Sequence, residues 1–407
     1  MADKPLLNTY GRLPIIFDHG QGPWLYDTDG HRYFDTFCGI GVSGLGHAHP
    51  AVTDAICKQS VKLLHCSNLF HTEVQHKFAT TLCEMSGMDG VFLANSGAEA
   101  NEAAIKLARL YGHNRGIESP VIVVMERSFH GRTLATLSAT GNRKVQAGFE
   151  PLVSGFSRVA FNDIQALETI AGMNQSVVAV MLEPVQGEGG VNIADHQWMR
   201  DVRSLCDRQG WLMILDEVQT GNGRSGHLFA YQGFGVKPDI VTTAKGLGNG
   251  FPIGACLAHG DAATTFKPGH HGSTFGGNAL ACAAALAVLD TLRNDRLFER
   301  AGQLGRRMLE TLHREFDDAD YISDIRGLGL IIGIELTSSC PELVPLAKTQ
   351  GLLLNVTAEC TIRLLPPLTL TDDEADYMIE RVVRVIKLYT GDDRPRVVEL
   401  DNDVTRH

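Results

Sequence analysis

The sequence predicts an α/β fold, with a mainly parallel central sheet flanked by helices and a second, smaller α+β domain. Three observations predict it: the 407 residues exceed one ordinary core, the 43 glycines suit many tight turns, and wholly apolar runs alternate with helical stretches. The runs expected to form buried strands of this sheet are residues 121–125, 177–182, 211–215 and 240–243.

The pattern of long apolar runs and helices gives way near residue 300 to a charged amphipathic helix and short strands, and this change suggests a domain boundary. We expect residues 1–60 to contribute to the small domain, 61–299 to form the large domain, 300–390 to form the C-terminal part of the small domain, and 391–407 to be a frayed polar tail. Apolar pieces around Asp27-Thr28-Asp29-Gly30 predict a β-hairpin. Pro50 is expected to start a helix through Leu64, and Thr371-Asp372-Asp373-Glu374 is a capping box that starts another.

Composition limits the classes of partner. A net charge of −11 argues against nucleic acid and anionic membranes. The first residues hold no apolar signal segment, and no apolar run reaches the length of a membrane span. Nine scattered cysteines without a C-x-x-C pair indicate reduced thiols, so we expect a cytoplasmic protein. His47 and His49 lack accompanying ligands, so we expect no metal.

Lys245 ends the apolar run 240–243 and precedes three glycines. An amine held still and desolvated at such a junction is suited to form a Schiff base with a carbonyl. The alternative is an ordinary surface lysine. A phosphate-binding P-loop is a poorer match, because glycine and not Ser or Thr follows the lysine. The formal G-x-G-x-x-G match at residues 39–44 is not followed directly by a helix, which leaves an NAD dehydrogenase without support.

Two further groups lie at expected strand ends. Ser96-Gly97-Ala98 opens a helix whose first N–H groups can hold a phosphate, although Ser96 could simply cap that helix. Asp216 ends a buried strand, where a charge is costly unless it meets a cation. A reactive lysine, a carboxylate for a pyridinium nitrogen and a phosphate seat together indicate pyridoxal 5′-phosphate (PLP).

Several motifs carry a resemblance to a known family. They are Gly46-His47-Ala48-His49-Pro50, residues 95–102, Phe129-His130-Gly131-Arg132, residues 183–188, residues 215–221, Ala244-Lys245 and residues 272–278. From about residue 10 to 388 the chain resembles class III aminotransferases of PLP fold type I, in the acetylornithine aminotransferase subgroup. The resemblance implies a homodimer with an active site shared across its interface.

The resemblance also implies roles for single residues. Lys245 would hold PLP, Asp216 would pair with the ring nitrogen and Gln219 would bond the phenolic oxygen. Phe129 and Val218 would sandwich the ring. The other implied cofactor contacts are Ser96, Gly97, Ala98 and Glu217, with Thr274 coming from the partner subunit.

The implied reaction moves the δ-amino group of N2-acetyl-L-ornithine to 2-oxoglutarate by a ping-pong mechanism, as a step of arginine biosynthesis. Arg132, with Ser273 nearby, would bind the carboxylate distal to the reacting centre in both substrates. Arg363 would bind the carboxylate adjacent to the reacting carbon of 2-oxoglutarate. Glu188 would neutralise Arg363 while the donor is bound.

Other donors stay open: ornithine, succinylornithine, N-succinyl-diaminopimelate and 4-aminobutyrate. Ile40 stands where ornithine δ-aminotransferases typically have a tyrosine, which favours an acylated amine. Tyr10 falls where that group has another substrate tyrosine. A catalytically silent binding protein of the same fold would need a broken Lys245 or Asp216, and both are present.

Overall fold

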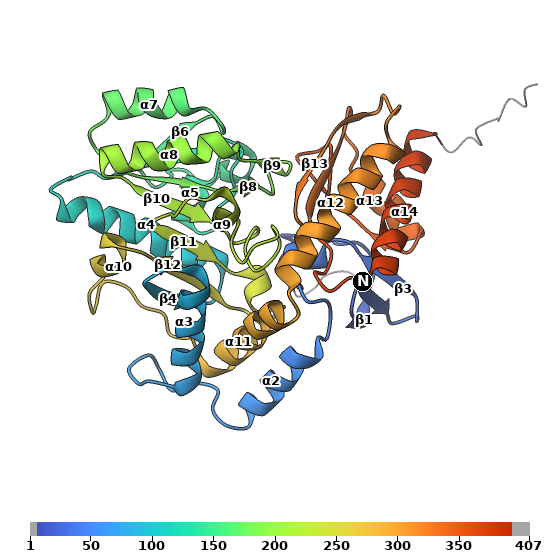
Figure 1. The fold of residues 1–407 in the computed structure, drawn as a ribbon, viewed down its shortest axis with the longest axis horizontal. Helices are drawn as coiled ribbons and strands as arrows, with labels where there is room; N and C mark the ends of the chain where they lie inside the picture. Colours follow the sequence, from blue (N-terminus) through green and yellow to red (C-terminus); the bar gives the residue numbers. More distant parts are fainter. Residues whose placement is uncertain (1–5, 393–407) are drawn as a thin grey trace, which may run out of the picture.

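The computed structural model describes residues 6–392. Figure 1 shows a larger lobe built on a central sheet and a smaller lobe beside it, with both ends of the chain contributing to the smaller one. Of the predicted polar tail, residues 393–407 lie outside the described residues. The exact domain boundaries at residues 60 and 299 stay predictions.

The larger lobe contains a seven-stranded sheet. Its strands, in spatial order, are β4 (Gly90–Ala94), β12 (Gly254–Ala258), β11 (Ile240–Thr243), β10 (Leu212–Asp216), β7 (Val177–Leu182), β5 (Val121–Met125) and β6 (Phe156–Val159). The pairs among β11, β10, β7, β5 and β6 are parallel, and β12 is antiparallel to both of its neighbours. The predicted mainly parallel sheet is therefore confirmed. The glycine- and alanine-rich β12 was not anticipated, because its sequence lacks the β-branched run of the other strands.

Side chains alternate along the buried strands and fill two cores. On β5, Ile122 and Val124 belong to the core with α4 (Gly97–Asn114), while Val123 and Met125 belong to the core on the opposite face. The helices that supply the second core are α3 (Glu73–Ser86), α7 (Ile164–Met173), α8 (His196–Gln209) and α11 (Ala279–Asn294). Two buried faces explain why these strands are apolar throughout and not alternating in polarity.

The smaller lobe joins the two ends of the chain. β1 (Phe17–Gln21), β2 (Trp24–Asp27) and β3 (Arg32–Asp35) form the predicted hairpin and its extension, and β15 (Leu352–Leu353) pairs in parallel with β3. Figure 1 shows these blue strands beside the orange and red C-terminal elements. A second sheet has the order β13 (Ile322–Leu328), β14 (Ile331–Leu336), β17 (Thr361–Leu364) and β16 (Asn355–Thr357).

Long helices cover the smaller lobe and link it to the larger one. α12 (Leu297–Glu315) follows α11, and α14 (Asp372–Thr390) begins at the predicted capping box, in which Thr371 accepts from the Glu374 N–H and Glu374 accepts from the Thr371 N–H. The predicted extent of α2 was wrong: it spans Pro50–Ser60, and Leu64 beyond it is exposed.

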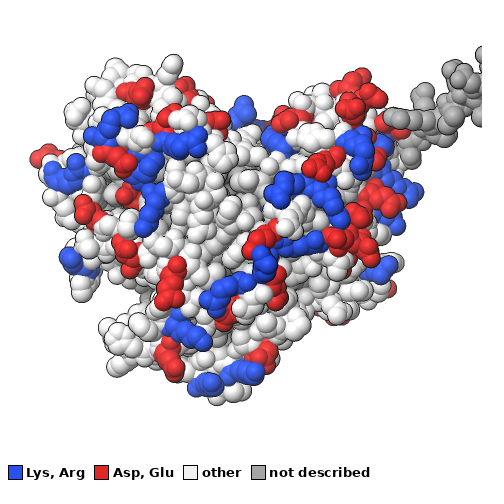
Figure 2. Space-filling view, viewed as in Figure 1, with Lys and Arg blue, Asp and Glu red and all other residues white. Residues whose placement is uncertain are grey.

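The remaining elements are short. They are α1 (Cys38–Gly41), α5 (Leu134–Ala139), α6 (Arg143–Gln146), β8 (Val185–Gln186), β9 (Asn192–Ile193), α9 (Ala230–Phe234), the 3-10 helix η1 (Lys245–Leu247), α10 (Asp261–Thr265) and α13 (Leu343–Thr349). Within residues 6–392, none of the helices is both long enough and apolar enough to span a bilayer. Figure 2 shows basic and acidic side chains interspersed over the visible face of both lobes. The nine cysteines are free thiols.

Candidate active site

A cavity of about 460 Å³ opens where the parallel strands end. Ligands of open α/β sheets bind at this carboxyl edge. The predicted site residues that line the cavity are Ser96, Gly97, Ala98, Phe129, Arg132, Glu188, Asp216, Val218, Gln219 and Lys245. They follow β4, β5, β7, β10 and β11, so the sheet brings together groups from five separate parts of the sequence.

Lys245 lies at the end of β11, in an uncommon backbone conformation. Its φ is 45°, in the left-handed region that a residue with a side chain seldom adopts. Asn222 donates from Nδ2 to the Ala244 carbonyl (3.1 Å) and to Thr243 Oγ1 (2.9 Å), which fixes the backbone just before the lysine. Burial lowers the pKa of the Lys245 amine below its ordinary value, while the Glu188 carboxylate opposes that shift. A lowered pKa leaves more of the amine in the neutral, nucleophilic form.

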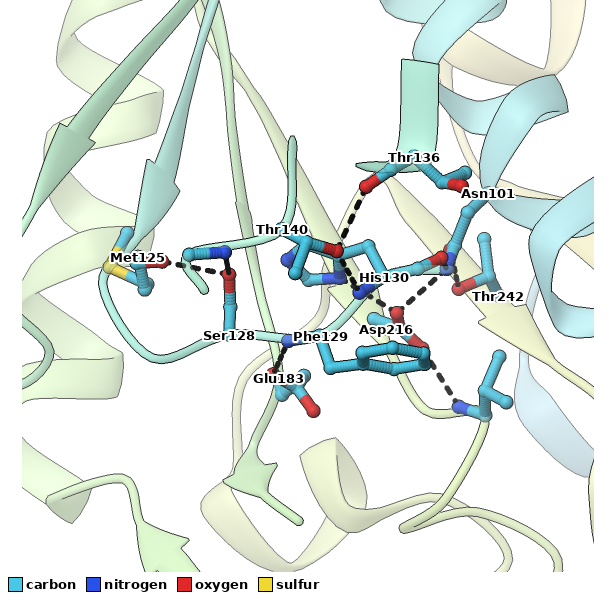
Figure 3. A network of polar contacts seen from close by, with 12 residues as sticks. Asn101, Met125, Ser128, Phe129, His130, Thr136, Thr140, Glu183, Asp216 and Thr242 are labelled. Atoms are coloured by element: carbon cyan, nitrogen blue, oxygen red, sulfur yellow. Dashed lines mark hydrogen bonds and ion pairs between the residues drawn. The ribbon is translucent and has the colours of Figure 1, made fainter. Parts of the chain in front are cut away.

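Asp216 ends β10 as a nearly buried carboxylate with three donors (Figure 3). Its Oδ2 accepts from Asn101 Nδ2 (2.7 Å) and from His130 Nδ1 (2.8 Å), and its Oδ1 accepts from the Val218 N–H (3.1 Å). Donors of this kind stabilise the ionised form of a carboxyl group. Asp216 is therefore equipped to face a protonated ring nitrogen.

The turn after β4 opens α4 beside the cavity. Ser96 Oγ accepts from the Glu99 N–H (3.2 Å), so the capping role of the Ser96 side chain is confirmed. Among the described residues, the N–H groups of Gly97 and Ala98 have no acceptor. A side chain at Gly97 would clash, because its Cβ would lie 2.7 Å from Val218 Cγ1. The turn therefore offers a phosphate two free N–H groups at a helix N-terminus.

Glu188 of the cavity lining forms an ion pair with Arg363, a predicted site residue that is buried behind it and does not itself line the cavity. Arg363 Nη1 donates to Glu188 Oε1 (2.6 Å) and to Gln219 Oε1 (3.3 Å). Asn355 Oδ1 accepts from Nε (3.0 Å) and Nη2 (2.7 Å) of the same guanidinium. Burial alone would raise the pKa of Glu188, but the charge of Arg363 and its hydrogen bond outweigh burial and lower it. Glu188 is therefore ionised while it faces this arginine.

Arg132 carries a charge that no described carboxylate pairs with. Its guanidinium carbon lies 5.7 Å from the centroid of the Phe129 ring. The Phe129 N–H donates to Glu183 Oε2 (2.9 Å), which fixes the backbone beneath that ring. Burial and the charge of Asp216 raise the pKa of the Glu183 carboxyl, which lies at the cavity wall, well above its ordinary range.

Several predicted residues do not reach the cavity. Glu217 is fully buried, and its carboxylate accepts from Thr220 Oγ1 (2.5 Å) and from the N–H groups of Ala230 and Tyr231 (both 2.9 Å). It follows Asp216 directly, and successive side chains of an extended segment point to opposite sides, so the Glu217 side chain points away from the cavity. Ile40, with a φ of 65°, packs against a small apolar cluster away from the cavity lining.

The other three outlying residues belong to exposed or intermediate segments. Ser273 Oγ accepts from Asn95 Nδ2 (3.2 Å), and Asn95 lines the cavity. Thr274 is exposed and lies outside the cavity lining. Tyr10 is exposed as well. Within one chain, therefore, Thr274 and Tyr10 have no place in the site.

Asn101, His130 and Glu183 were not predicted as site residues, yet all three line the cavity. One signal was present for Asn101: it is a polar residue on the buried stripe of α4 that includes Ala104 and Ala108. All three residues lie inside motifs of the family resemblance, but their partners come from elements far apart in the sequence, so no local pattern connected them.

The donor set fits PLP. Gly97 and Ala98 offer free N–H groups to a phosphate, Asp216 offers a carboxylate to a ring nitrogen, and Lys245 offers an amine to a carbonyl. When bound, PLP supplies an electron sink for breaking bonds at the carbon that bears the amino group. A strand-end lysine, carboxylate and helix N-terminus around one cavity define a PLP-dependent enzyme of fold type I.

Comparison with known proteins places the chain in a family. A profile described as aminotransferase class-III matches residues 7–386. Acetylornithine aminotransferase of Nitrosomonas europaea is 52% identical over 94% of this chain and 97% of its own length, and that of Methanothermobacter thermautotrophicus is 46% identical over 94% and 96%. The chain belongs to the class-III aminotransferase family, and it is a transaminase with PLP as cofactor.

Solved structures agree with the fold. The ornithine aminotransferase of Toxoplasma gondii superposes with a TM-score of 0.92 at 34% identity, covering 96% of this chain and 94% of that one. N-acetylornithine aminotransferase of Stenotrophomonas maltophilia gives 0.82 at 35% identity, covering 94% and 98%. Enzymes named for ornithine and for N-acetylornithine are thus both represented among the structural relatives.

Proposed function

We propose that this enzyme moves the δ-amino group of N2-acetyl-L-ornithine to 2-oxoglutarate, giving N-acetyl-L-glutamate 5-semialdehyde and L-glutamate, in arginine biosynthesis. The observation that carries the proposal is the pairing of buried Arg363 with Glu188 of the cavity wall at 2.6 Å, while Arg132 of that wall is unpaired by any described acid. Donor and acceptor each carry a distal carboxylate, which the unpaired arginine can bind. Only 2-oxoglutarate carries a second carboxylate, beside its reacting carbon, and the neutralised arginine can bind it once its acidic partner leaves. The names of the relatives in the comparison support the acetylated donor.

In this proposal, Arg132 binds the distal carboxylate of donor and acceptor alike. Arg363 binds the carboxylate beside the reacting carbon of 2-oxoglutarate, and Glu188 releases it at that stage. While the donor is bound, Glu188 returns to Arg363, since the donor has no carboxylate there. Exchanging one bidentate or ionic partner for another keeps the buried guanidinium compensated throughout.

Lys245 is assigned two tasks: it holds the cofactor, and its amine Nζ moves the proton between the substrate carbon and the cofactor. The lowered pKa of this amine supports the second task, because an amine must be neutral to take up a proton. Asp216 pairs with the ring nitrogen, Gln219 meets the phenolic oxygen, and Phe129 and Val218 hold the ring between them. Gly97 and Ala98 bind the phosphate.

We also propose a homodimer in which Thr274 of each chain completes the phosphate site of the other. The support is an exposed apolar surface beside Thr274: Leu69 is 86%, Phe70 66% and Phe275 60% exposed. Asn68 donates from Nδ2 to the carbonyls of Ser273 (3.0 Å) and Gly276 (2.9 Å), which ties the two loops of this surface together. The nine free cysteines support a cytoplasmic location.

Donor choice is tested by single-turnover conversion of the PLP form to the amine form, followed by absorbance. N2-acetylornithine, ornithine, succinylornithine, N-succinyl-diaminopimelate and 4-aminobutyrate are compared in parallel. We expect the ratio of the rate constant to the dissociation constant to be highest for N2-acetylornithine. Ornithine is the second candidate, supported by the TM-score of 0.92 to an ornithine aminotransferase, and a higher value with it would replace our assignment.

A further inference from the structure

Asn101 is a buried amide on an otherwise apolar stripe of α4, with neighbours Ala104 and Ala108 wholly buried. Figure 3 shows its side chain between Asp216 and Thr242. Asn101 Nδ2 donates to Asp216 Oδ2 (2.7 Å) and to the His130 carbonyl (2.8 Å), and Thr242 Oγ1 donates to Asn101 Oδ1 (2.6 Å). A helix that packs on a sheet gains nothing from an amide in its core unless the amide is fully bonded, as this one is.

These contacts leave one orientation for the amide. Rotating it by half a turn would set Oδ1 against the Asp216 carboxylate and the His130 carbonyl, two acceptors that cannot donate. The hydroxyl of Thr242 is a donor to Oδ1 in the observed orientation. Thr242 and Asp216 therefore fix the amide from opposite ends, and both of its N–H groups are used.

The acceptor positions of the Asp216 carboxylate can then be counted one by one. An ionised carboxylate offers about four lone-pair positions. Two on Oδ2 are taken by Asn101 and His130, and one on Oδ1 is taken by the Val218 N–H. One position on Oδ1 is left for a donor in the cavity that Asp216 lines.

His130 cannot replace the missing donor if Asn101 is lost. Its Nδ1 already donates to Asp216, because an ionised carboxylate can only accept. Its buried Nε2 has no partner in the part of the chain that the structure describes. The second donor to Oδ2 therefore depends on Asn101 alone.

We propose that Asn101, oriented by Thr242, is a positioning residue that holds Asp216 as an ionised acceptor with a single open site for the cofactor's ring nitrogen. This rests on the proposed pairing of Asp216 with that nitrogen. Without the Asn101 donor, Asp216 keeps two open positions and loses one of the groups that stabilise its charge, so it discriminates less well for a protonated nitrogen.

The test uses equilibrium binding to the apoenzyme, not turnover. Each protein is titrated with PLP and with its 1-deaza analogue, in which CH replaces the ring nitrogen while the phosphate and the aldehyde are kept. The ratio of the two dissociation constants isolates the ring-nitrogen contact. The variants are Asn101→Leu, Thr242→Val and Thr242→Ser, and Ser138→Ala serves as a buried-hydroxyl control because Ser138 bonds Leu134 and Val153, away from Asp216.

We expect the wild type to prefer PLP and Asn101→Leu to reduce that preference about tenfold or more, as for the loss of one charge-assisted hydrogen bond. Thr242→Val should reduce it less, while Thr242→Ser and Ser138→Ala should keep the wild-type ratio. If Asn101→Leu does not fold, Thr242→Val still decides the matter through the same ratio.

Two results would overturn the proposal in different ways. If Asn101→Leu and Thr242→Val weaken both ligands equally, so that the ratio stays at the wild-type value, the network is merely structural. If the wild type itself binds both ligands alike, Asp216 does not meet the ring nitrogen, and that part of the proposed function is wrong as well.

Discussion

Arg363 Nη1 donates to Glu188 Oε1 over 2.6 Å, although the two side chains differ greatly in exposure: 1% for Arg363 and 35% for Glu188. The arginine stays in place, held also by Asn355, whereas the glutamate lies on the open side of the cavity. If one partner moves when 2-oxoglutarate enters, the exposed glutamate is the one that can be hydrated at low cost.

We predict opposite effects for the two members of this pair. Arg363→Ala should slow the 2-oxoglutarate half-reaction about 10- to 100-fold, the value of roughly 1.5–3 kcal/mol for a lost charged hydrogen bond, and should largely spare the donor half-reaction. Glu188→Ala should penalise the donor half-reaction more, because the buried guanidinium then lacks its counter-charge. Stopped-flow absorbance of each half-reaction measures both effects. Equal losses in both half-reactions for Arg363→Ala would show that the switch is misassigned.

Arg132 should behave differently from Arg363. Since both substrates present a distal carboxylate, Arg132→Ala should slow both half-reactions by a similar factor, again roughly 10- to 100-fold. Arg200→Ala is a matched control, because Arg200 is exposed, its side chain bonds only Gln197 on α8, and it does not line the cavity. The same stopped-flow traces decide the question, and a loss confined to the 2-oxoglutarate step would refute the idea of a shared anchor.

The parts of this site that the sequence predicted are those tied to strand ends. Lys245, Asp216 and the turn at Gly97 each follow an apolar run, and the ends of parallel strands meet at one edge, so their proximity followed from the fold class. Glu217, implied as a cofactor contact only by the family resemblance, does not line the cavity, because its side chain points to the opposite side of the chain from that of Asp216.

Other features of the site and of the fold could not be predicted from the sequence, because they depend on how distant elements pack together. The bond between Asn101 and Asp216 joins residues 115 positions apart. Its existence depends on how α4 lies across the sheet, and an amide within an alanine-rich helix indicates only that some partner exists. The antiparallel direction of β12 likewise depends on its connection and not on its composition.

The raised pKa of buried Glu217 predicts how the stability of the fold changes with pH. Burial raises its pKa to about 7 from an ordinary 4.5. In the folded state the carboxyl therefore keeps its proton to higher pH than in the unfolded state, so this contribution to stability is present below about pH 4.5 and is lost as the pH rises through about 7. The loss amounts to at most about 3 kcal/mol.

Thermal unfolding at pH 5 and pH 8 tests this, with Glu217→Gln as the comparison. Glutamine keeps one acceptor oxygen but does not titrate. We expect the wild type to lose a few degrees more of Tm than the variant between the two pH values. Glu183 is present in both proteins, so its contribution to the pH dependence cancels. Parallel changes in Tm for the two proteins would mean that Glu217 does not titrate in this range.

The proposed sharing of the active site between two chains leads to a prediction that requires a mixed dimer. Thr274 is exposed, outside the cavity lining, and next to exposed Phe275. If Thr274 serves the partner's phosphate site, a chain with Lys245→Ala and a chain with Thr274→Asp should complement each other. In the mixed dimer, the Thr274→Asp chain keeps its own Lys245 and receives an intact Thr274 from the Lys245→Ala chain.

Each homodimer should be impaired: Lys245→Ala because the amine that holds the cofactor is gone, and Thr274→Asp because a carboxylate would repel the phosphate. After the two proteins are dissociated and reassembled together, we expect one of the two sites in every mixed dimer to recover wild-type activity. Tagged chains allow the mixed species to be purified before the aminotransferase assay, and light scattering checks that it is a dimer.

If Thr274 acted within its own chain, the mixed dimer would contain one site without Lys245 and one with a repelled phosphate, so no recovery would appear. Absence of recovery in a verified mixed dimer would therefore refute the shared site.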